Sequence, residues 1–398
     1  MAKKTIQDLR NLQGQRVLIR VDFNVPLDDQ GHITNDRRIR AALPTIQYVL
    51  DRGASAIVMS HLGRPKGDAK KDAIYRMDRV AERLGELLQK PVRKSDEVVG
   101  EKAKSAAKNL QPGQVLVLEN LRFHPGEQKG DETFARQLAD LGDVYVNDAF
   151  GTCHRSDASM VAVPKAMTGQ PRVVGFLVAK ELEILGKLLS SPHRPLIGIL
   201  GGAKVSDKIG FMKSLLNQVD RLLIGGAMTY TFMKAQGLSI GNSKAETDKL
   251  DVARQILGLG QQKIAFPVDH LVVQSIETPE GAKVVSGDIP EGWVGVDIGP
   301  KTISEYENEI ARASMVVWNG PMGKFEDEPF SRGTKAVAEA LGRCPGVTVV
   351  GGGETAEAVE EFGIAEKMNH VSTGGGAFLE YIEGTPFPAL DQIEDKTP

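Results

Sequence analysis

The sequence predicts an α/β protein of two doubly wound, Rossmann-like domains with parallel sheets. Short continuous apolar runs alternate with helical patterns along the chain, which is typical of parallel strands covered by helices on both faces. The chain has 398 residues, more than one hydrophobic core usually serves. The apolar runs end in cationic residues in the first half and in glycine in the second, so we expect each half to form its own domain.

Four apolar runs in the first half each end in a polar or cationic cluster. These clusters begin at Asp22, His61, Asn120 and Asn147. A helical pattern usually follows the cluster. Over residues 41–53, for example, apolar residues recur at helical spacing and Gly53 is the expected C-terminal stop.

Five apolar runs in the second half end in glycine instead. The junctions read GGAK, GGAM, NGPMG, GGGET and TGGGA, beginning at residues 201, 225, 319, 351 and 373. A helical pattern follows the first junction over residues 206–219, where one apolar stripe contains Ile209, Met212, Leu216 and Val219.

Residues 178–195 separate the two halves. Leucines at helical spacing give this segment one apolar face, and Pro192 and Pro195 end it. The segment could be one more crossover helix, but the change of loop chemistry on either side favours an interdomain helix. We therefore expect an N-terminal domain over residues 1–177, the helix over 178–191 and a second domain over 192–375.

Composition excludes several classes of protein. The formal net charge of -3 gives no global reason to expect binding to nucleic acid or to a membrane, so an anion-binding surface must be local. Cys153 and Cys344 lie far apart, which is no disulfide framework and fits a reducing compartment. The start MAKKTIQDLRN lacks the apolar stretch of a secretory signal, and no apolar run reaches the roughly 18 residues of a membrane span.

The polar clusters of the first half indicate a site for a small anion. Ligands of open α/β sheets bind beyond the carboxyl ends of the strands. Arginines gathered there repel one another unless an anion joins them, and guanidinium groups bind phosphate or carboxylate in a bidentate manner. Any one of these residues could instead be an ordinary surface or structural residue, but the same types recur at the same topological place. The candidates are Asp22, Asn24, His61, Arg64, Arg122, His154 and Arg155, with Arg37, Arg38 and Arg40 from a nearby segment.

The glycine-rich junctions of the second half indicate a nucleotide site. Glycine lets the backbone approach a phosphate, and a helix N-terminus offers free N–H groups. If the helix begins near Lys204, the ammonium groups of Lys204 and Lys208 lie on one face near its start. Glu354 could approach a Mg²⁺ ion carried by the nucleotide, and Glu326 could bind ribose hydroxyls. Alternatively, both glutamates could be ordinary surface residues without a role in binding.

An anion site in one half and a nucleotide site in the other suggest phosphoryl transfer across a cleft between the domains. The Walker A, HExxH and GxSxG patterns are absent, and no GxGxxG follows a strand. A Rossmann-type dehydrogenase is one alternative, although its fingerprint is missing. A two-lobed anion-binding protein of the periplasmic type is another, although no signal peptide is visible.

Nine motifs, in order through essentially the whole chain, resemble those of the phosphoglycerate kinase family. They are RVDFNVP (20–26), DRRIRAALPTI (36–46), SHLGRP (60–65), LENLRFHPGE (118–127), NDAFGTCHR (147–155), GGAKVSDKI (201–209), NGPMGKFE (319–326), GGGET (351–355) and STGGGA (372–377).

The resemblance implies a hinge-bending kinase that moves the acyl phosphate of 1,3-bisphosphoglycerate to ADP, reversibly and with Mg²⁺. It implies a monomeric, cytoplasmic enzyme of glycolysis without nucleic-acid or membrane partners. It also implies that residues 376–398 return to the N-terminal domain.

The same resemblance assigns the site residues. The residues that match the phosphoglycerate site are Asp22, Phe23, Asn24, Arg38, His61, Leu62, Gly63, Arg64, Arg122 and Arg155. Those that match the nucleotide site are Ala203, Lys204, Lys208, Gly225, Gly226, Gly295, Glu326, Gly351, Gly352, Gly353, Glu354 and Thr355. Arg38 and Lys204 match the catalytic positions, Glu354 matches the metal contact, and Gly374, Gly375 and Gly376 match the helix N-terminus that stabilises the transition state.

The chain departs from the family pattern at three places. Glu354 stands where aspartate is usual, which makes a water-bridged metal contact the alternative to a direct one. Ser156 and Asp157 replace Ala-His, which puts an acidic group near the anion site if Asp157 points inward. Residues 378–380 read FLE rather than SLE, which affects how the returning segment packs.

Overall fold

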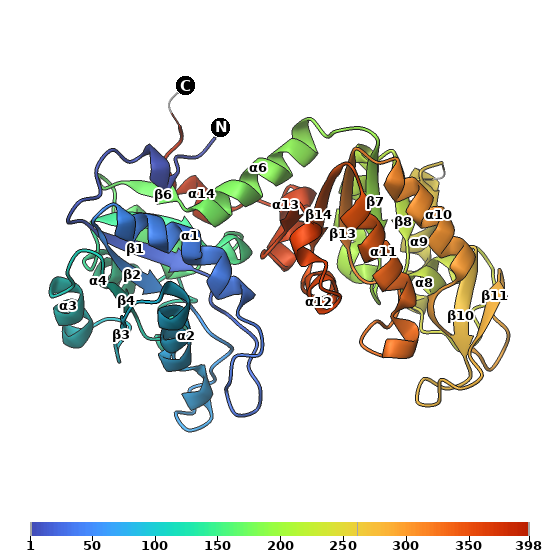
Figure 1. Cartoon of the computed structure of the whole chain (residues 1–398), viewed down its shortest axis with the longest axis horizontal. Coiled ribbons are helices and arrows are strands. Elements are labelled where there is room, and N and C mark those ends of the chain that lie inside the picture. Colours follow the sequence, from blue (N-terminus) through green and yellow to red (C-terminus); the bar gives the residue numbers. More distant parts are fainter. Residues whose placement is uncertain (1, 261, 397–398) are drawn as a thin grey trace. The chain divides into compact units, whose positions relative to one another are not determined.

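In a computed structural model, which describes residues 2–260 and 262–396, the chain folds as an α/β protein of two compact units (Figure 1). Unit 1 comprises the residues up to Glu183 together with those from Pro386, and unit 2 comprises Ile184–Thr385. Each unit contains a six-stranded sheet flanked by helices, which confirms the predicted fold class.

The sheet of unit 1 has the strand order β3-β4-β2-β1-β5-β6, and every neighbouring pair is parallel. Leu18 and Ile19 are successive residues of the central strand and both are fully buried, because both faces of the sheet are covered. The strands are β1 (Arg16–Val21), β2 (Ser55–Met59), β3 (Val92–Lys94), β4 (Val115–Val117), β5 (Val144–Asp148) and β6 (Arg172–Val174). The helices are α1 (Arg37–Asp51), α2 (Asp78–Leu88), α3 (Glu101–Lys108), α4 (Glu132–Ala139), α5 (Val163–Ala166) and α14 (Pro388–Asp391).

The main sheet of unit 2 is also parallel, in the order β15-β14-β13-β7-β8-β9. Its strands are β7 (Leu196–Leu200), β8 (Arg221–Ile224), β9 (Ile264–Ala265), β13 (Met315–Asn319), β14 (Val347–Gly351) and β15 (His370–Val371). Its helices are α7 (Ile209–Gln218), α8 (Met228–Ala235), α9 (Leu250–Gly260), α10 (Pro300–Ala311), α11 (Arg332–Arg343), α12 (Gly353–Glu361) and α13 (Gly376–Glu383). Trp318 of β13 is fully buried and anchors one core cluster of this unit.

Unit 2 carries a second, antiparallel sheet that the sequence pattern did not predict. Its strands are β10 (Asp269–Val273), β11 (Lys283–Ser286) and β12 (Val294–Ile298), in the order β11-β10-β12. The edge strand β11 is largely exposed, so it lacks the continuous apolar run by which the buried parallel strands were recognised.

The interdomain segment forms helix α6 (Phe176–Ser190), close to the expected 178–191, and the division between the units falls within it, after Glu183. The returning segment begins at Pro386 rather than at residue 376. The expected start is too early because α13 packs on α7 in unit 2, where the rings of Phe211 and Phe378 lie 6.2 Å apart.

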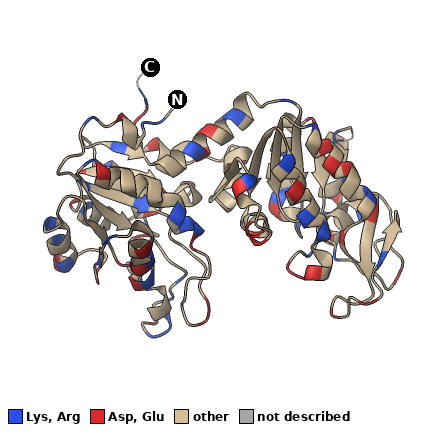
Figure 2. Cartoon of the chain, viewed as in Figure 1, with Lys and Arg blue, Asp and Glu red and all other residues tan. Residues whose placement is uncertain are grey.

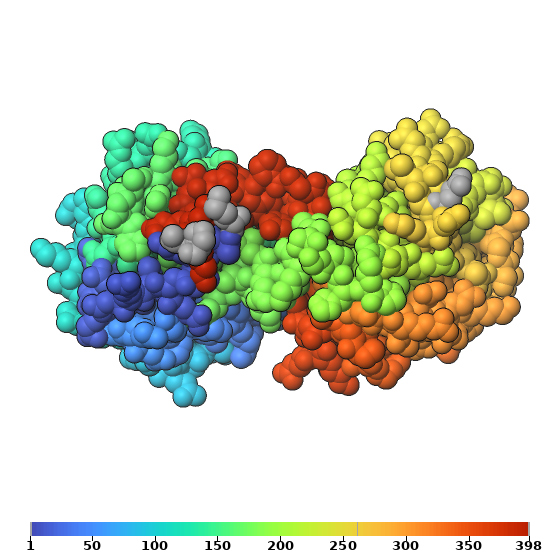
Figure 3. Space-filling view, turned by 90° about the horizontal axis from the view of Figure 1, so that it is seen from above, coloured from blue at the N-terminus to red at the C-terminus, as the bar shows by residue number. Residues whose placement is uncertain are grey.

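From Pro386 onward the chain lies beside the N-terminal segment of unit 1. The backbone N–H of Lys4 donates to the carbonyl of Glu394 at 2.8 Å. Figure 3 shows the C-terminal residues, in red, next to the N-terminal residues, in blue.

Lys and Arg residues are interspersed with Asp and Glu along the helices of each unit (Figure 2). This distribution agrees with the small net charge and with the expectation that anion binding is local. In the part of the chain that the structure describes, no helix is long and apolar enough to cross a membrane.

Candidate active site

Four loops of unit 1 meet at one edge of its sheet because they follow neighbouring strands. In the order β4-β2-β1-β5 the strands are parallel, so their carboxyl ends lie at the same edge. The loops begin at Leu118, Ser60, Asp22 and Ala149. They carry most of the residues predicted to bind an anion, and Arg37, Arg38 and Arg40 lie in the first turn of α1.

Arg38, in the first turn of α1, forms an ion pair with Asp22 at the end of β1. Its Nη1 donates to Oδ2 of Asp22 at 2.8 Å. Burial alone would raise the pKa of Asp22, but the charges of Arg38 and Arg20 outweigh it and hold the pKa below its ordinary value. Arg40 instead pairs with Asp36, the residue that precedes α1, and the side chain of Arg40 is exposed.

The loop after β2 is held by hydrogen bonds from the loop after β1. Ser60 Oγ accepts from the backbone N–H of Phe23 at 2.8 Å, and Asn24 Oδ1 accepts from that of Gly63 at 2.8 Å. Gly63 has a φ of 62°, and a Cβ there would lie 2.3 Å from the ring of Tyr75. Phe23 and Leu62 are both buried in the core.

Asn120 organises this edge of the sheet, and sequence reasoning did not assign it a role. Its Oδ1 accepts from the backbone N–H of Leu62 and of Arg122, both at 3.1 Å. Its Nδ2 donates to the carbonyls of Leu62 and Tyr75, at 2.7 and 2.9 Å. This fully buried amide therefore fixes the loops that carry His61 and Arg122.

The arginines of these loops lie close enough to repel one another. Burial and the charges of Arg155, Arg20 and Arg64 lower the pKa of Arg122, while the charge of Asp157 opposes the change. Nη1 of Arg122 donates to the carbonyl of Gly63, and its Nε is buried without a hydrogen-bond partner among the described residues. Such a cluster favours a bound anion that joins the guanidinium groups.

Asp157 is one of the residues that differ from the usual phosphoglycerate kinase pattern. It is buried, and its negative charge raises the pKa of Arg122. The carboxyl group of Asp157 therefore interacts electrostatically with the arginines of this site.

His61 is buried among the same charges. Burial, together with the charges of Arg20, Arg122 and Arg155, lowers its pKa to about 3, and the charge of Asp22 opposes this change. The imidazole is therefore neutral at physiological pH. In this form the ring can donate and accept hydrogen bonds but carries no charge.

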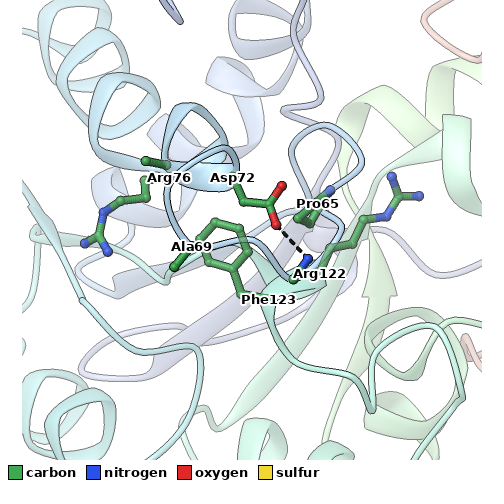
Figure 4. A pocket seen from close by; sticks show the side chains of 8 residues that line it. Pro65, Ala69, Asp72, Arg76, Arg122 and Phe123 are labelled. Atoms are coloured by element: carbon green, nitrogen blue, oxygen red, sulfur yellow. Dashed lines mark hydrogen bonds between the residues drawn. The ribbon is translucent and has the colours of Figure 1, made fainter.

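A pocket of about 310 Å³ lies beside these loops, lined by Pro65, Gly67, Ala69, Asp72, Ala73, Arg76, Arg122 and Phe123 (Figure 4). The buried Asp72 accepts from the backbone N–H of Gly67 at 2.7 Å and closes the turn beside it. The guanidinium of Arg122 points away from Asp72 and Phe123 in Figure 4. The pocket therefore adjoins the arginine cluster without being its centre.

In unit 2, the five glycine-rich junctions follow the neighbouring strands β15-β14-β13-β7-β8. Their glycines allow backbone segments to approach closely. A Cβ on Gly201 would lie 1.9 Å from the carbonyl oxygen of Pro321, and one on Gly226 would lie 2.4 Å from the backbone nitrogen of Gly202. Gly225 is bound to the same strand ends, since its N–H donates to the carbonyl of Leu200 at 2.7 Å.

The side chain of Lys208 forms hydrogen bonds with backbone groups at these strand ends. Its Nζ donates to the carbonyl of Gly201 at 2.7 Å and to that of Asn319 at 3.4 Å. Burial lowers its pKa to about 8, and the charges of Glu354 and Asp207 oppose the change. Ala203 and Lys204 are exposed on the same loop.

The helical pattern over residues 206–219 is present, but the helix does not begin as early as Lys204, which is the condition for Lys204 and Lys208 to share one of its faces. A 3₁₀ turn covers Ser206–Lys208, and α7 begins at Ile209. The reason is a contact distant in sequence, since both carboxylate oxygens of Glu246 accept from the backbone N–H and the hydroxyl of Ser206. Glu246 thus holds the lysine loop, and no motif in the sequence indicated it.

The two helix N-termini expected at glycines are present. α12 begins at Gly353, after Gly352 with a φ of 93°, and α13 begins at Gly376, after Gly375 with a φ of 53°. Gly351 ends β14, and Gly374 donates its N–H to Ser372 Oγ at 3.0 Å. Thr355 is buried, and its hydroxyl accepts from the backbone N–H of Gly320 at 2.6 Å, which ties α12 to the end of β13.

Gly295 and Glu326 come from other elements of unit 2. Gly295 lies in β12, where a Cβ would meet the hydroxyl of the buried Tyr230 at 2.1 Å. Its N–H donates to Ser243 Oγ at 2.9 Å. Glu326 is exposed in the loop after β13.

The donors of unit 2 fit an ion carried by phosphates better than a resident metal. Among residues 2–260 and 262–396, no group of three or more His, Cys, Asp or Glu side chains could hold a metal ion. Glu354 is an exposed carboxylate in the first turn of α12, and its charge reaches Lys208. One carboxylate suffices for Mg²⁺ that keeps its waters and the nucleotide phosphates as its other ligands.

Comparison with known proteins identifies the family of the chain. The family model described as phosphoglycerate kinase matches residues 6–385. A curated phosphoglycerate kinase of Rhodopirellula baltica is 52% identical over 398 residues, covering 99% of this chain and 100% of its own. That of Moorella thermoacetica is 50% identical over 400 residues and covers 100% of both chains.

Solved structures agree as well. The phosphoglycerate kinase of Coxiella burnetii matches with a TM-score of 0.85 and 38% identity, over 98% of both chains. That of Pyrococcus horikoshii matches with a TM-score of 0.85 and 32% identity, again over 98% of both chains. The chain belongs to the phosphoglycerate kinase family.

Proposed function

We propose that unit 1 of this kinase holds the phosphoglycerate and unit 2 the adenine nucleotide, and that the phosphoryl group passes between them in line, without a general base. The reaction is the reversible transfer between 1,3-bisphosphoglycerate with ADP and 3-phosphoglycerate with ATP, a step of glycolysis. The observation that carries this assignment is the group of mutually repelling arginines around Arg122, which favours a multiply charged small anion.

In the ATP-consuming direction the nucleophile is a carboxylate, which is already ionised near neutral pH. The chemical difficulty is electrostatic, because anions must approach and charge spreads over the transferring group. We assign Arg38 and Lys204 to the stabilisation of that charge, with the helix N-termini at Gly353 and Gly376. Asp22, Asn24, His61, Arg64, Arg122 and Arg155 position the glycerate.

The nucleotide occupies the glycine-rich strand ends, with Lys208 beside its phosphates and Glu326 at its ribose. Glu354 holds Mg²⁺, directly or through water, and the ion when bound offsets the charge of the phosphates. Lys208 must leave its carbonyl partners to reach a phosphate. In the absence of a phosphate, burial disfavours its charged form and lowers its pKa to about 8.

Because the two sets of residues belong to different units, we propose that transfer requires a hinge motion that brings them together and excludes water. We also propose a monomeric, cytoplasmic enzyme. Two cysteines without a disulfide fit a reducing compartment.

A coupled assay of ATP-dependent phosphorylation of 3-phosphoglycerate tests the assignment. Arg38→Ala and Lys204→Ala should each lower kcat by roughly a hundredfold or more, because they remove charge stabilisation of the transition state. Arg40→Ala and Lys213→Ala are matched controls, since both are exposed and Arg40 pairs with Asp36. If Arg38→Ala and Lys204→Ala turned over at the rate of these controls, the two catalytic roles would be wrong.

A further inference from the structure

Arg20 is a fully buried arginine near the end of β1. Its guanidinium donates from Nε to Ser159 Oγ at 2.9 Å and from Nη1 to the carbonyl of Val21. Its Nη2 lies 3.2 Å from Nδ1 of His61. A buried arginine whose three nitrogens each meet a defined partner is held in one orientation.

The contact with His61 decides where the imidazole carries its proton. A guanidinium group has donors and no acceptor, so Nδ1 of His61 must be the acceptor. A neutral imidazole has one N–H, and it is therefore on Nε2. The ring then offers a hydrogen-bond donor from Nε2.

Two further residues hold Arg20 in place. Ser159 accepts from Arg20 and donates its own hydroxyl proton to Glu127 Oε1 at 2.5 Å. The backbone N–H of Ser159 donates to Glu127 Oε2 at 3.0 Å. Glu127 is fully buried, and burial raises the pKa of its carboxyl group while the charge of Arg20 opposes the change. The series Glu127, Ser159, Arg20 and His61 thus runs from the core to the arginine cluster.

Burial, aided by the surrounding arginines, keeps His61 neutral. Asp22 Oδ1 lies 3.9 Å from Nδ1 and favours protonation, but it is already paired with Arg38. Arg20 at the end of the same strand, Arg122 after β4 and Arg155 after β5 all oppose protonation, as does burial.

We propose that Arg20 is a positioning residue that fixes His61 as the neutral Nε2–H tautomer, so that His61 is a permanent hydrogen-bond donor to the anionic substrate bound by Arg122 and Arg155. The identity of that substrate rests on the proposed function, whereas the tautomer does not. A donor without charge holds an oxygen of the ligand without adding to the repulsion among the arginines. Because the ring carries no second proton, it keeps its Nε2–H as the pH rises through neutrality.

Long-range ¹H–¹⁵N correlation NMR on ligand-free, ¹⁵N-histidine-labelled protein reads the tautomer directly. His61→Gln identifies the signal. Between pH 5.5 and 8.5 the wild-type His61 should show a proton on Nε2, none on Nδ1 and no change with pH. A proton on Nδ1, or a titration within this range, would overturn the proposal without any variant having to fold.

Arg20→Met removes the donor and should give His61 a mixture of tautomers, with the KM for 3-phosphoglycerate raised about tenfold as the imidazole loses its orientation. Arg20→Lys keeps one cationic donor and should retain the Nε2–H signal. The matched control is Arg16→Met, because Arg16 lies on the same strand but pairs with Asp143. An unchanged tautomer in Arg20→Met, or an equal change in Arg16→Met, would contradict the assignment. If wild type and all three variants showed the expected tautomers but none of them phosphorylated 3-phosphoglycerate, the proposed function would be wrong and the positioning role of Arg20 would stand.

Discussion

Nη1 of Arg38 donates to Oδ2 of Asp22 at 2.8 Å, and the side chain of Asp22 is 6% exposed whereas that of Arg38 is 31% exposed. The carboxylate is therefore a buried support, and the guanidinium is the part of the pair that solvent or a ligand can reach. Charge-assisted hydrogen bonds of this kind are among the stronger ones in proteins.

Asp22→Asn should lower kcat/KM for 3-phosphoglycerate at least tenfold. The amide has the shape of the carboxylate but lacks the charge that holds Arg38, and a hydrogen bond to a charged group contributes about 1.5–3 kcal/mol. Steady-state kinetics against Asp36→Asn gives the comparison, since Asp36 binds Arg40 and Arg83 on the surface. Equal kinetics in the two variants would mean that Asp22 does not position Arg38.

Asn120→Ala should destabilise unit 1 and raise the KM for 3-phosphoglycerate. The substitution leaves two buried backbone groups of Leu62 and two partly buried ones of Tyr75 and Arg122 without the amide, which we expect to cost about 3 kcal/mol in the free energy of unfolding. Urea denaturation and kinetics measure the two effects. Asn109→Ala is the control, because its exposed amide makes one long contact of 3.4 Å to Ser105. A KM unchanged in Asn120→Ala would show that the loops keep their places without the amide.

Strand-end residues such as Asp22, His61 and Arg122 could be recognised from the sequence because a parallel sheet brings the ends of adjacent strands together. The same topology explains why the glycine-rich junctions of unit 2 cluster. The alternatives of a dehydrogenase and a periplasmic binding protein fall with the match to phosphoglycerate kinases over nearly the whole chain.

Other features depend on contacts that sequence spacing does not contain. Arg20 lies inside an apolar run and reads as a strand residue, and only the fold shows it beside His61. Glu246, which holds the turn before α7, is 40 residues from Ser206. Strand β11 is exposed and carries no continuous apolar run. Each was missed because a tertiary partner, and not a local pattern, determines it.

Glu354→Gln should raise the Mg²⁺ concentration needed for half-maximal activity several-fold while the rate at saturating Mg²⁺ falls less. The neutral amide is a weaker ligand for a hard cation than a carboxylate. Activity measured against Mg²⁺ at fixed nucleotide concentration gives both quantities. Glu354→Asp should retain activity, and Glu357→Gln, exposed on the same helix, is the control. A Mg²⁺ requirement identical in Glu354→Gln and Glu357→Gln would remove Glu354 from the metal site.

Asp148 anchors the first turn of α6 to unit 1. Its Oδ1 accepts from the backbone N–H of Leu177 at 2.9 Å and of Val178 at 3.3 Å. Thr45 lies against the same carboxyl group and accepts from the N–H of Phe176 at 2.9 Å. Oδ2 has no hydrogen-bond partner among the described residues, and burial raises the pKa of Asp148 from 3.8 to about 7.

Asp148→Asn should therefore remove a pH dependence of stability. Because the folded pKa exceeds that of the unfolded chain, the native state binds more protons between about pH 4 and 7, and the stability contributed by Asp148 falls as the pH rises through this range. The change corresponds to roughly 4 kcal/mol at most. In urea denaturation, the variant should gain stability relative to wild type from pH 4.5 to 7.5. Asp143→Asn should show no such trend above pH 5, because Arg16 lowers the pKa of Asp143 despite its partial burial. A constant difference between Asp148→Asn and wild type across this range would mean that Asp148 is ionised in the folded protein throughout.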